Sequence, residues 1–141
     1  MIYDNYGRMN WDPLWMKFAT LVSERSPHPT FKVGAVIVNS DNTRVLSIGY
    51  NGDHSGGLNK LASEEPGMSG FIHAEVNAII KMDYISDPGK KMYLTLSPCV
   101  DCARVIVNSG IKTIFYEKEY RDRSGIDLLI SQHISVNMLK I

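Results

Sequence analysis

The stretch KMYLTLSPCVDCARVIVNSGIKTIFYE, residues 91–117, decides the predicted fold. Its first part, 91–96, predicts a strand, and 111–117 predicts a second strand. Between them, 99–110 has the pattern of a helix that closes at Gly110, because glycine readily adopts the left-handed conformation common at helix ends. A strand, a helix and a strand in this order are typical of parallel strands joined by a right-handed crossover.

The same alternation extends on both sides of this stretch. The other predicted elements are helices at 13–25, from His73 to about Tyr84 and at 125–133, and strands at 33–39, 43–50 and 134–139. The first two strands form a hairpin, and a polar, glycine-rich loop at 51–70 is long enough to suggest a function. We therefore predict an α/β fold of three layers, α/β/α, with one five-stranded mixed sheet and helices on both faces.

Length and charge narrow the classes of function. The 141 residues fit a single domain spanning 1–141, with no linker or repeat. Fifteen acidic residues balance fifteen basic ones, so the protein has no large electrostatic field from its net charge. This argues against duplex DNA or an anionic membrane as a partner. The N-terminus lacks the pattern of a secretory signal, and no apolar run is long enough to span a bilayer, so we expect a cytoplasmic protein.

Two short motifs carry the predicted chemistry. His73-Ala74-Glu75 and Pro98-Cys99-Val100-Asp101-Cys102 each stand at the start of a predicted helix. One imidazole and two thiolates make three metal ligands, and the chain has no further cysteine for a fourth. A structural zinc site normally has four protein ligands, whereas three leave a position open for water. The pattern therefore predicts a catalytic zinc ion on His73, Cys99 and Cys102.

Glu75 is the predicted proton carrier. Zinc lowers the pKa of bound water, and a neighbouring carboxylate can accept the proton and pass it to a substrate. Alone, H-x-E occurs by chance, and C-x-x-C also occurs in redox proteins, but together they are the signature of zinc-dependent base deaminases. A redox role would leave His73 and Glu75 unexplained.

Longer segments resemble one family. HAEVNAI (73–79) and TLSPCVDCA (95–103) resemble the cytidine and deoxycytidylate deaminases, and KVGAVIVN (32–39), GYNGDHSGG (49–57) and SGIKTIFY (109–116) are similar to the deoxycytidylate (dCMP) deaminases. The resemblance covers about 25–139. It implies a cytidine deaminase-like fold and hydrolysis of dCMP to dUMP and ammonia, which supplies dUMP for thymidylate synthesis. The compact length is similar to phage or bacterial enzymes, which for a phage protein means the host cytoplasm.

The resemblance also assigns residues in the site. It implies zinc on His73, Cys99 and Cys102, acid–base catalysis by Glu75, and substrate contacts from Asn51, Ala74, Ser97 and Tyr120. Asn51 would contact the sugar, and the backbone of Ala74 and Ser97 would hold the pyrimidine. For Asn51 the alternative is a turn residue in a left-handed conformation, and for Tyr120 it is a surface aromatic.

The family is commonly a homohexamer regulated by nucleotides. The resemblance implies activation by dCTP and inhibition by dTTP, each with Mg²⁺, near Gly49, Tyr50, Asn51 and Gly52. Glycines there suit the approach of phosphates to the backbone, and the alternative is a flexible loop. The basic residues considered as phosphate partners are Arg25, Lys32, Lys60 and Arg121.

Two positions depart from the family pattern. His54 stands where relatives often have proline, and Phe71 stands where some phage relatives have a histidine ligand for a second zinc. We therefore predict one zinc ion per subunit. Two other functions remain open, namely deamination of another small base (cytidine, guanine or a tRNA adenosine) and a zinc-stabilised binding module without catalysis.

Overall fold

The computed structural model describes residues 1–83 and 86–141. Within them the helices are α1 (Trp11–Ser23), α2 (Ala74–Lys81), α3 (Val100–Ser109) and α4 (Ser124–Ser131), and the strands are β1 (Gly34–Val38), β2 (Val45–Tyr50), β3 (Lys91–Leu96), β4 (Thr113–Lys118) and β5 (Ser135–Met138). Each predicted element is present, with ends that differ by at most three residues, and β3 has the predicted bounds. The helix predicted to reach Tyr84 ends at Lys81, and Tyr84 itself lies outside the described residues.

The five strands form one mixed sheet in the order β2-β1-β3-β4-β5. β1 runs antiparallel to both of its neighbours, whereas β3, β4 and β5 are parallel. β2 and β3 both run opposite to β1, so they point the same way although they do not touch. The crossovers predicted from the helix–strand alternation therefore join strands of one direction, and the predicted three-layer fold with a mixed sheet is confirmed.

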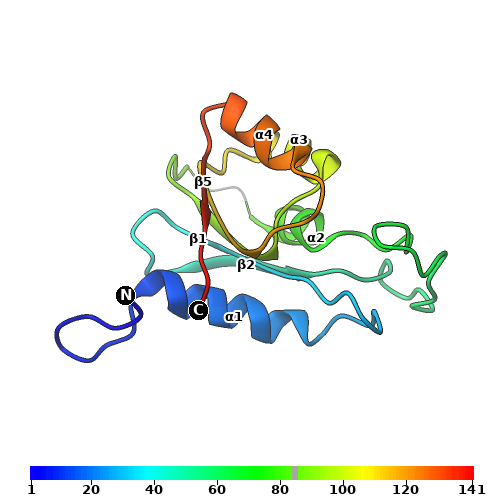
Figure 1. Cartoon of the computed structure of the whole chain (residues 1–141), viewed down its shortest axis with the longest axis horizontal. Helices are drawn as coiled ribbons and strands as arrows, with labels where there is room; N and C mark the ends of the chain where they lie inside the picture. Colours follow the sequence, from blue (N-terminus) through cyan, green and yellow to red (C-terminus); the bar gives the residue numbers. More distant parts are fainter. Residues whose placement is uncertain (84–85) are drawn as a thin grey trace.

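Helices cover both faces of the sheet (Figure 1). β1 is buried along its whole length, and its side chains alternate between two cores. Ala35 and Ile37 face the core under α2, α3 and α4, whereas Val36 and Val38 face the core under α1. A strand buried on both faces is apolar throughout, which explains the unbroken run GAVIV.

Helix α1 approaches β1 closely because residue 34 is glycine. A Cβ at Gly34 would lie 2.0 Å from the backbone oxygen of Ala19. Met16, Ala19 and Val22 then pack on the α1 side of the sheet. This close contact fixes both ends of the chain segment that connects α1 to β1.

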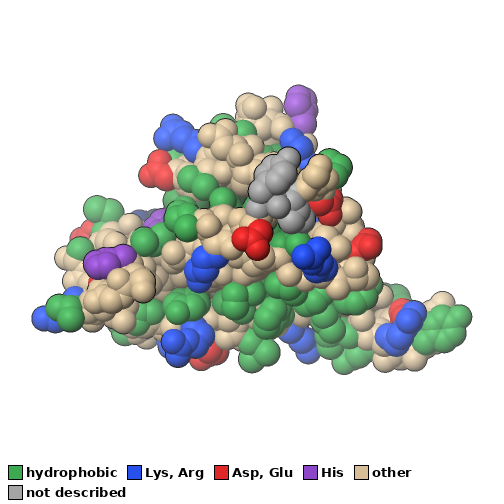
Figure 2. Space-filling view, turned by 180° about the vertical axis from the view of Figure 1, so that it is seen from behind, with side chains coloured by type: hydrophobic (Ala, Val, Ile, Leu, Met, Phe, Trp, Pro, Cys, Tyr) green, Lys and Arg blue, Asp and Glu red, His purple; other side chains and the backbone are tan. Residues whose placement is uncertain are grey.

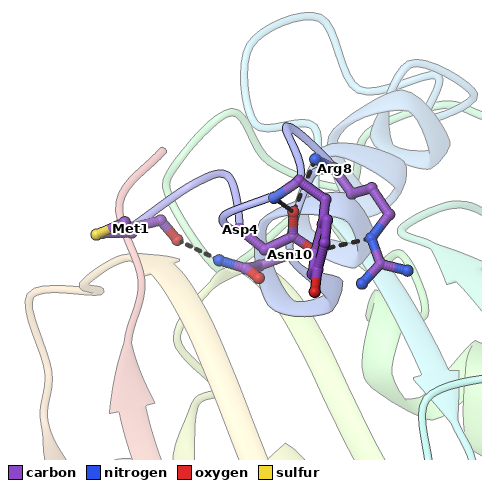
Figure 3. A network of polar contacts seen from close by, with 5 residues as sticks. Met1, Asp4, Arg8 and Asn10 are labelled. Atoms are coloured by element: carbon purple, nitrogen blue, oxygen red, sulfur yellow. Dashed lines mark hydrogen bonds and ion pairs between the residues drawn. The ribbon is translucent and has the colours of Figure 1, made fainter.

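The first ten residues form a polar loop in front of α1 (Figure 3). The Asp4 carboxylate accepts hydrogen bonds from the backbone and side chain of Arg8, and the Asn10 amide donates to the backbone oxygen of Met1. These bonds to Asp4 lower the pKa of its carboxyl. This segment is thus an ordered turn held by its own polar groups.

The described helices include none that is both long and apolar enough to cross a membrane. On the face shown in Figure 2, basic and acidic side chains are scattered among apolar ones, with no broad area of a single sign.

Candidate active site

Two helix starts bring the predicted metal ligands together. His73 immediately precedes α2, Cys99 immediately precedes α3, and Cys102 lies in the first turn of α3. The Nδ1 atom of His73 is 3.1 Å from Sγ of Cys102 and 3.6 Å from Sγ of Cys99. All three donor atoms lie within 4.8 Å of one another. The residues that the sequence separates by 26 positions therefore form one cluster.

The cluster has the composition and size of a zinc site. A tetrahedral ion with bonds of about 2.0 Å to nitrogen and about 2.3 Å to sulfur separates its ligands by roughly 3.5 Å. The distances from His73 Nδ1 to the two sulfurs fit this spacing. Among residues 1–83 and 86–141, no other group of three or more histidine, cysteine or acidic side chains is close enough to hold an ion.

The two thiols shift each other's pKa in opposite directions. A hydrogen bond from Cys102 to the Cys99 thiolate lowers the pKa of Cys99 to about 4, and His73 acts in the same direction. The pKa of Cys102 is raised in turn by the neighbouring Cys99 and by burial. The pKa of the Cys99 thiol is thus lowered and that of Cys102 raised, and a bound divalent cation would stabilise both as thiolates.

Glu75 lies beside the cluster in the first turn of α2. Its side chain is only 4% exposed. Burial raises the pKa of its carboxyl to about 7, because a charged carboxylate loses its water there. A carboxyl with this pKa can both accept and release a proton near neutrality.

A cavity of about 330 Å³ opens in front of Glu75. This volume is within the range of small-molecule sites. Each predicted catalytic, metal-binding and substrate-binding residue except Cys102 lines it, namely Asn51, His73, Ala74, Glu75, Ser97, Cys99 and Tyr120. The structure therefore gathers the predicted residues around one space.

Tyr120 and Ser97 form one edge of this cavity. The backbone N–H of Tyr120 donates to Oγ of Ser97 at 2.6 Å, and Ser97 is buried. The Tyr120 hydroxyl reaches the 53–72 loop, because a Cβ at Gly67 would lie 3.2 Å from it. Tyr120 is therefore half-buried between two parts of the chain and is not a simple surface aromatic.

Asn51 also lines the cavity, and its side chain has a structural task. Its side-chain Oδ1 accepts from the backbone N–H of Val33 at 2.8 Å, and its Nδ2 donates to the backbone oxygen of Phe31 at 2.7 Å. Asn51 is not among the residues with a left-handed backbone, which contradicts the alternative of a turn asparagine. The amide instead ties the end of β2 to the segment before β1.

The two glycines of the GYNG segment, residues 49–52, make close contacts with other parts of the chain. A Cβ at Gly49 would lie 2.4 Å from the backbone oxygen of Ala74, so this glycine lets β2 pack against the start of α2. Gly52 exchanges two backbone hydrogen bonds with Ile72, at 2.8 and 3.1 Å. These bonds close the 53–71 loop and return the chain to His73. Two of the four residues therefore help to place the metal cluster.

The predicted phosphate partners lie in different places. Arg121 lines the cavity, and Lys32 lies in a separate groove beside α1. The guanidinium of Arg25 lies 5.9 Å from the centre of the Tyr50 ring, and Lys81 Nζ lies 5.5 Å from it. Lys60 is exposed in the 53–72 loop. Of the four predicted residues, only Arg121 is a cavity residue.

Two further residues at the site were missed in the sequence. His28, which follows α1 between two prolines, lines the cavity although neither motif includes it. Gly125, in the first turn of α4, packs against the segment that holds Cys99, where a Cβ would lie 2.2 Å from the Pro98 oxygen and 2.8 Å from the carbonyl carbon of Cys99. A glycine in a first helical turn is a weak signal for such contact, and only the packing reveals it.

The two departures from the family pattern have separate surroundings. Phe71 is buried and packs edge-on against the His28 ring, with centroids 6.0 Å apart. His54 is exposed and lies beside Asp53, with Nδ1 2.9 Å from the carboxylate.

Known proteins resemble both this sequence and this fold. The family described as "Cytidine and deoxycytidylate deaminase zinc-binding region" matches residues 9–118. Human deoxycytidylate deaminase is 37% identical over 131 residues, covering 84% of this chain and 70% of the human one. Deoxycytidylate deaminase of Mycobacterium phage D29 is 34% identical over 128 residues, covering 80% and 98% respectively.

A solved structure has the same architecture. The dCMP deaminase of cyanophage S-TIM5, crystallised with dCMP and dUMP, superimposes with a TM-score of 0.80 at 36% identity, covering 90% of this chain and 95% of the other. The family match includes His73, Cys99 and Cys102 and spans most of the chain. The chain therefore belongs to the cytidine and deoxycytidylate deaminase family.

Proposed function

We propose that this protein is a zinc-dependent deaminase that hydrolyses dCMP to dUMP and ammonia, with residues 1–141 forming one catalytic domain. The observation that carries the proposal is a cluster of one imidazole and two thiols beside a buried carboxyl, inside a cavity. The choice of dCMP is supported by the human and phage relatives named deoxycytidylate deaminase and by the cyanophage complex with dCMP and dUMP.

In this proposal His73, Cys99 and Cys102 hold one zinc ion. Bound zinc supplies a water molecule that is nucleophilic near neutral pH. Glu75 would take one proton from the attacking water and deliver it to N3 of the cytosine ring. It would then take the remaining proton from the new hydroxyl on C4 and pass it to the amine, which leaves as ammonia while C4 becomes a carbonyl. Its pKa of about 7 suits both transfers. The backbone of Ala74 and Ser97 holds the polar edge of the pyrimidine.

The remaining cavity residues bind the rest of the nucleotide. Tyr120 closes the cavity over the substrate, and its backbone is held by Ser97. Arg121 lines the cavity, and no other lysine or arginine of the described residues does. It is our candidate for binding the 5′-phosphate. Asn51 supports the sugar side.

Regulation by nucleotides would act at the GYNG segment. Arg25 and Lys81 both approach the Tyr50 ring. Neither cation forms an ion pair within the described part of the chain. Two cations beside an aromatic ring suit an anionic nucleotide. We propose that dCTP with Mg²⁺ activates and dTTP with Mg²⁺ inhibits a homohexamer through this place.

The decisive experiment measures zinc per chain and ammonia release from dCMP, CMP, deoxycytidine, dCTP and guanine, with dCTP or dTTP and Mg²⁺ added in a second series. We expect one zinc ion per chain and the highest kcat/KM with dCMP. Faster turnover of another base would identify a different deaminase, and zinc-loaded protein without any turnover would indicate a binding module. Glu75→Ala should retain zinc and lose activity.

A further inference from the structure

His28 presents a hydrogen-bond donor of fixed identity. The residue is only 3% exposed. Its Nδ1 atom accepts hydrogen bonds from the backbone N–H groups of Thr30 at 3.1 Å and Phe31 at 2.9 Å. A hydrogen on Nδ1 would point at these two donors. The imidazole therefore carries its hydrogen on Nε2, and Nε2 can only donate.

The Nε2–H group is an accessible part of a residue that lines the cavity. Among residues 1–83 and 86–141, no group accepts a hydrogen bond from Nε2, yet no buried side-chain nitrogen of this part lacks a partner. Nε2 is therefore accessible, although the residue as a whole is buried. The rings of Phe31 and Phe71 flank the imidazole at 5.2 and 6.0 Å, and His28 lines the cavity. The accessible edge thus belongs to a residue that lines the proposed substrate space.

Asn51, the predicted sugar contact, is less free than His28. Each end of its amide is already bonded to the backbone of Phe31 or Val33. Ser26 joins the two residues through their backbones. Its hydroxyl donates to the backbone oxygen of Asn51 at 2.8 Å and accepts from the backbone N–H of His28 at 3.2 Å. Asn51 thus holds the segment 26–33 in place. His28 of this segment supplies a donor, Nε2–H, that has no partner among the described residues.

A neutral donor between two phenylalanine rings suits a neutral oxygen, whereas a phosphate dianion suits Arg121. The hydroxyl of a deoxynucleotide is at the 3′ position. We propose that Nε2 of His28 donates a hydrogen bond to the 3′-hydroxyl oxygen of the deoxynucleotide substrate, which makes His28 a specificity-determining residue. This inference rests on the proposed deamination of dCMP.

Three variants separate binding from folding. His28→Asn retains an acceptor for the two backbone N–H groups and removes the distal donor. His28→Gln retains a donor at the distal position and removes the near acceptor. His133→Asn is the matched control, because His133 is exposed and has a left-handed backbone that asparagine tolerates.

We expect His28→Asn to raise KM for dCMP about 3- to 10-fold, the effect of one neutral hydrogen bond. Its kcat, zinc content and Tm should remain near those of the unchanged protein. His28→Gln should recover part of the KM, and His133→Asn should change nothing. When 2′,3′-dideoxycytidine 5′-monophosphate replaces dCMP, KM of the unchanged protein should rise by the same factor. KM of His28→Asn should not rise further.

A measurement without substitutions tests the same bond. With ¹⁵N-labelled histidine, dUMP should shift the Nε2–H resonance of His28, and 2′,3′-dideoxyuridine 5′-monophosphate should not. Equal shifts, or an equal loss by His28→Asn on dCMP and on its dideoxy analogue, would overturn the role of His28. Zinc-loaded, unsubstituted protein that does not deaminate dCMP would overturn the proposed function instead.

Discussion

Two parts of the cavity lining are built in different ways. The metal wall, defined as residues 73–75 and 97–102, consists of two helix starts and the turns just before them. The sugar wall, defined as residues 26–33 with Asn51, has no helix or strand except where β2 ends beside Asn51. Its shape comes from side chains that bind backbone groups, such as His28 with Phe31 and Asn51 with Val33.

The difference separates chemistry from selectivity. On the metal wall, each helix start places its ligands by local geometry, so a short motif is sufficient to carry the chemistry. On the sugar wall, donors and acceptors meet only after α1 has packed on β1. We therefore expect substitutions in the metal wall to change zinc content and kcat, and substitutions in the sugar wall to change KM and stability.

The largest effect should follow the loss of a ligand. Cys102→Ser removes one of three donors, so zinc content should fall close to zero and deamination of dCMP should become undetectable. Metal analysis and ammonia release measure both. Asp101→Asn is the control, because the Asp101 side chain lies between the two cysteines in sequence but is 85% exposed. Equal loss of zinc in both variants would contradict the assigned ligands.

Glu75→Gln should have the next largest effect. The amide keeps the size of the carboxyl but cannot carry the proton, so kcat should fall by about 10²- to 10⁴-fold. Zinc content should stay at the level of the unchanged protein, which distinguishes this variant from Cys102→Ser. A decrease of kcat smaller than tenfold would remove Glu75 from the proton transfers.

The metal wall could be predicted almost completely from the sequence. His73, Glu75, Cys99 and Cys102 occur in two short motifs, and each motif includes the first turn of its helix. The fold was equally accessible, because its strands and helices have clear periodicity and the run GAVIV indicates a strand buried on both faces.

The sugar wall could not be predicted in the same way. His28 acquires a role only because two backbone N–H groups select its tautomer and two distant aromatic rings flank it. Gly49 also has a packing role that no short motif indicates, since its missing Cβ makes room for the backbone of α2. Contacts between segments far apart in the chain carry no short sequence pattern.

A pair of glycine substitutions compares the two walls directly. A Cβ at Gly125 would press on the backbone of Pro98 and Cys99, and a Cβ at Gly34 would press on Ala19, next to the sugar wall. Overpacking of this kind costs about 3 kcal/mol in the free energy of unfolding. We expect both alanine variants to lose stability in urea, but only Gly125→Ala to bind zinc more weakly. Equal zinc affinity in the two variants would show that α4 does not position Cys99.

Asn51→Ala should have the smallest effect on unfolding. The change leaves the backbone oxygen of Phe31 and the N–H of Val33 without their side-chain partner, at a position only 7% exposed. The free energy of unfolding should fall by about 1–2 kcal/mol. Because the 26–33 segment then moves with His28 on it, KM for dCMP should rise in the same variant, whereas zinc content should not change. If KM rose without any loss of stability in urea, Asn51 would be a direct sugar contact, and the two walls would both act on the substrate through side chains that touch it.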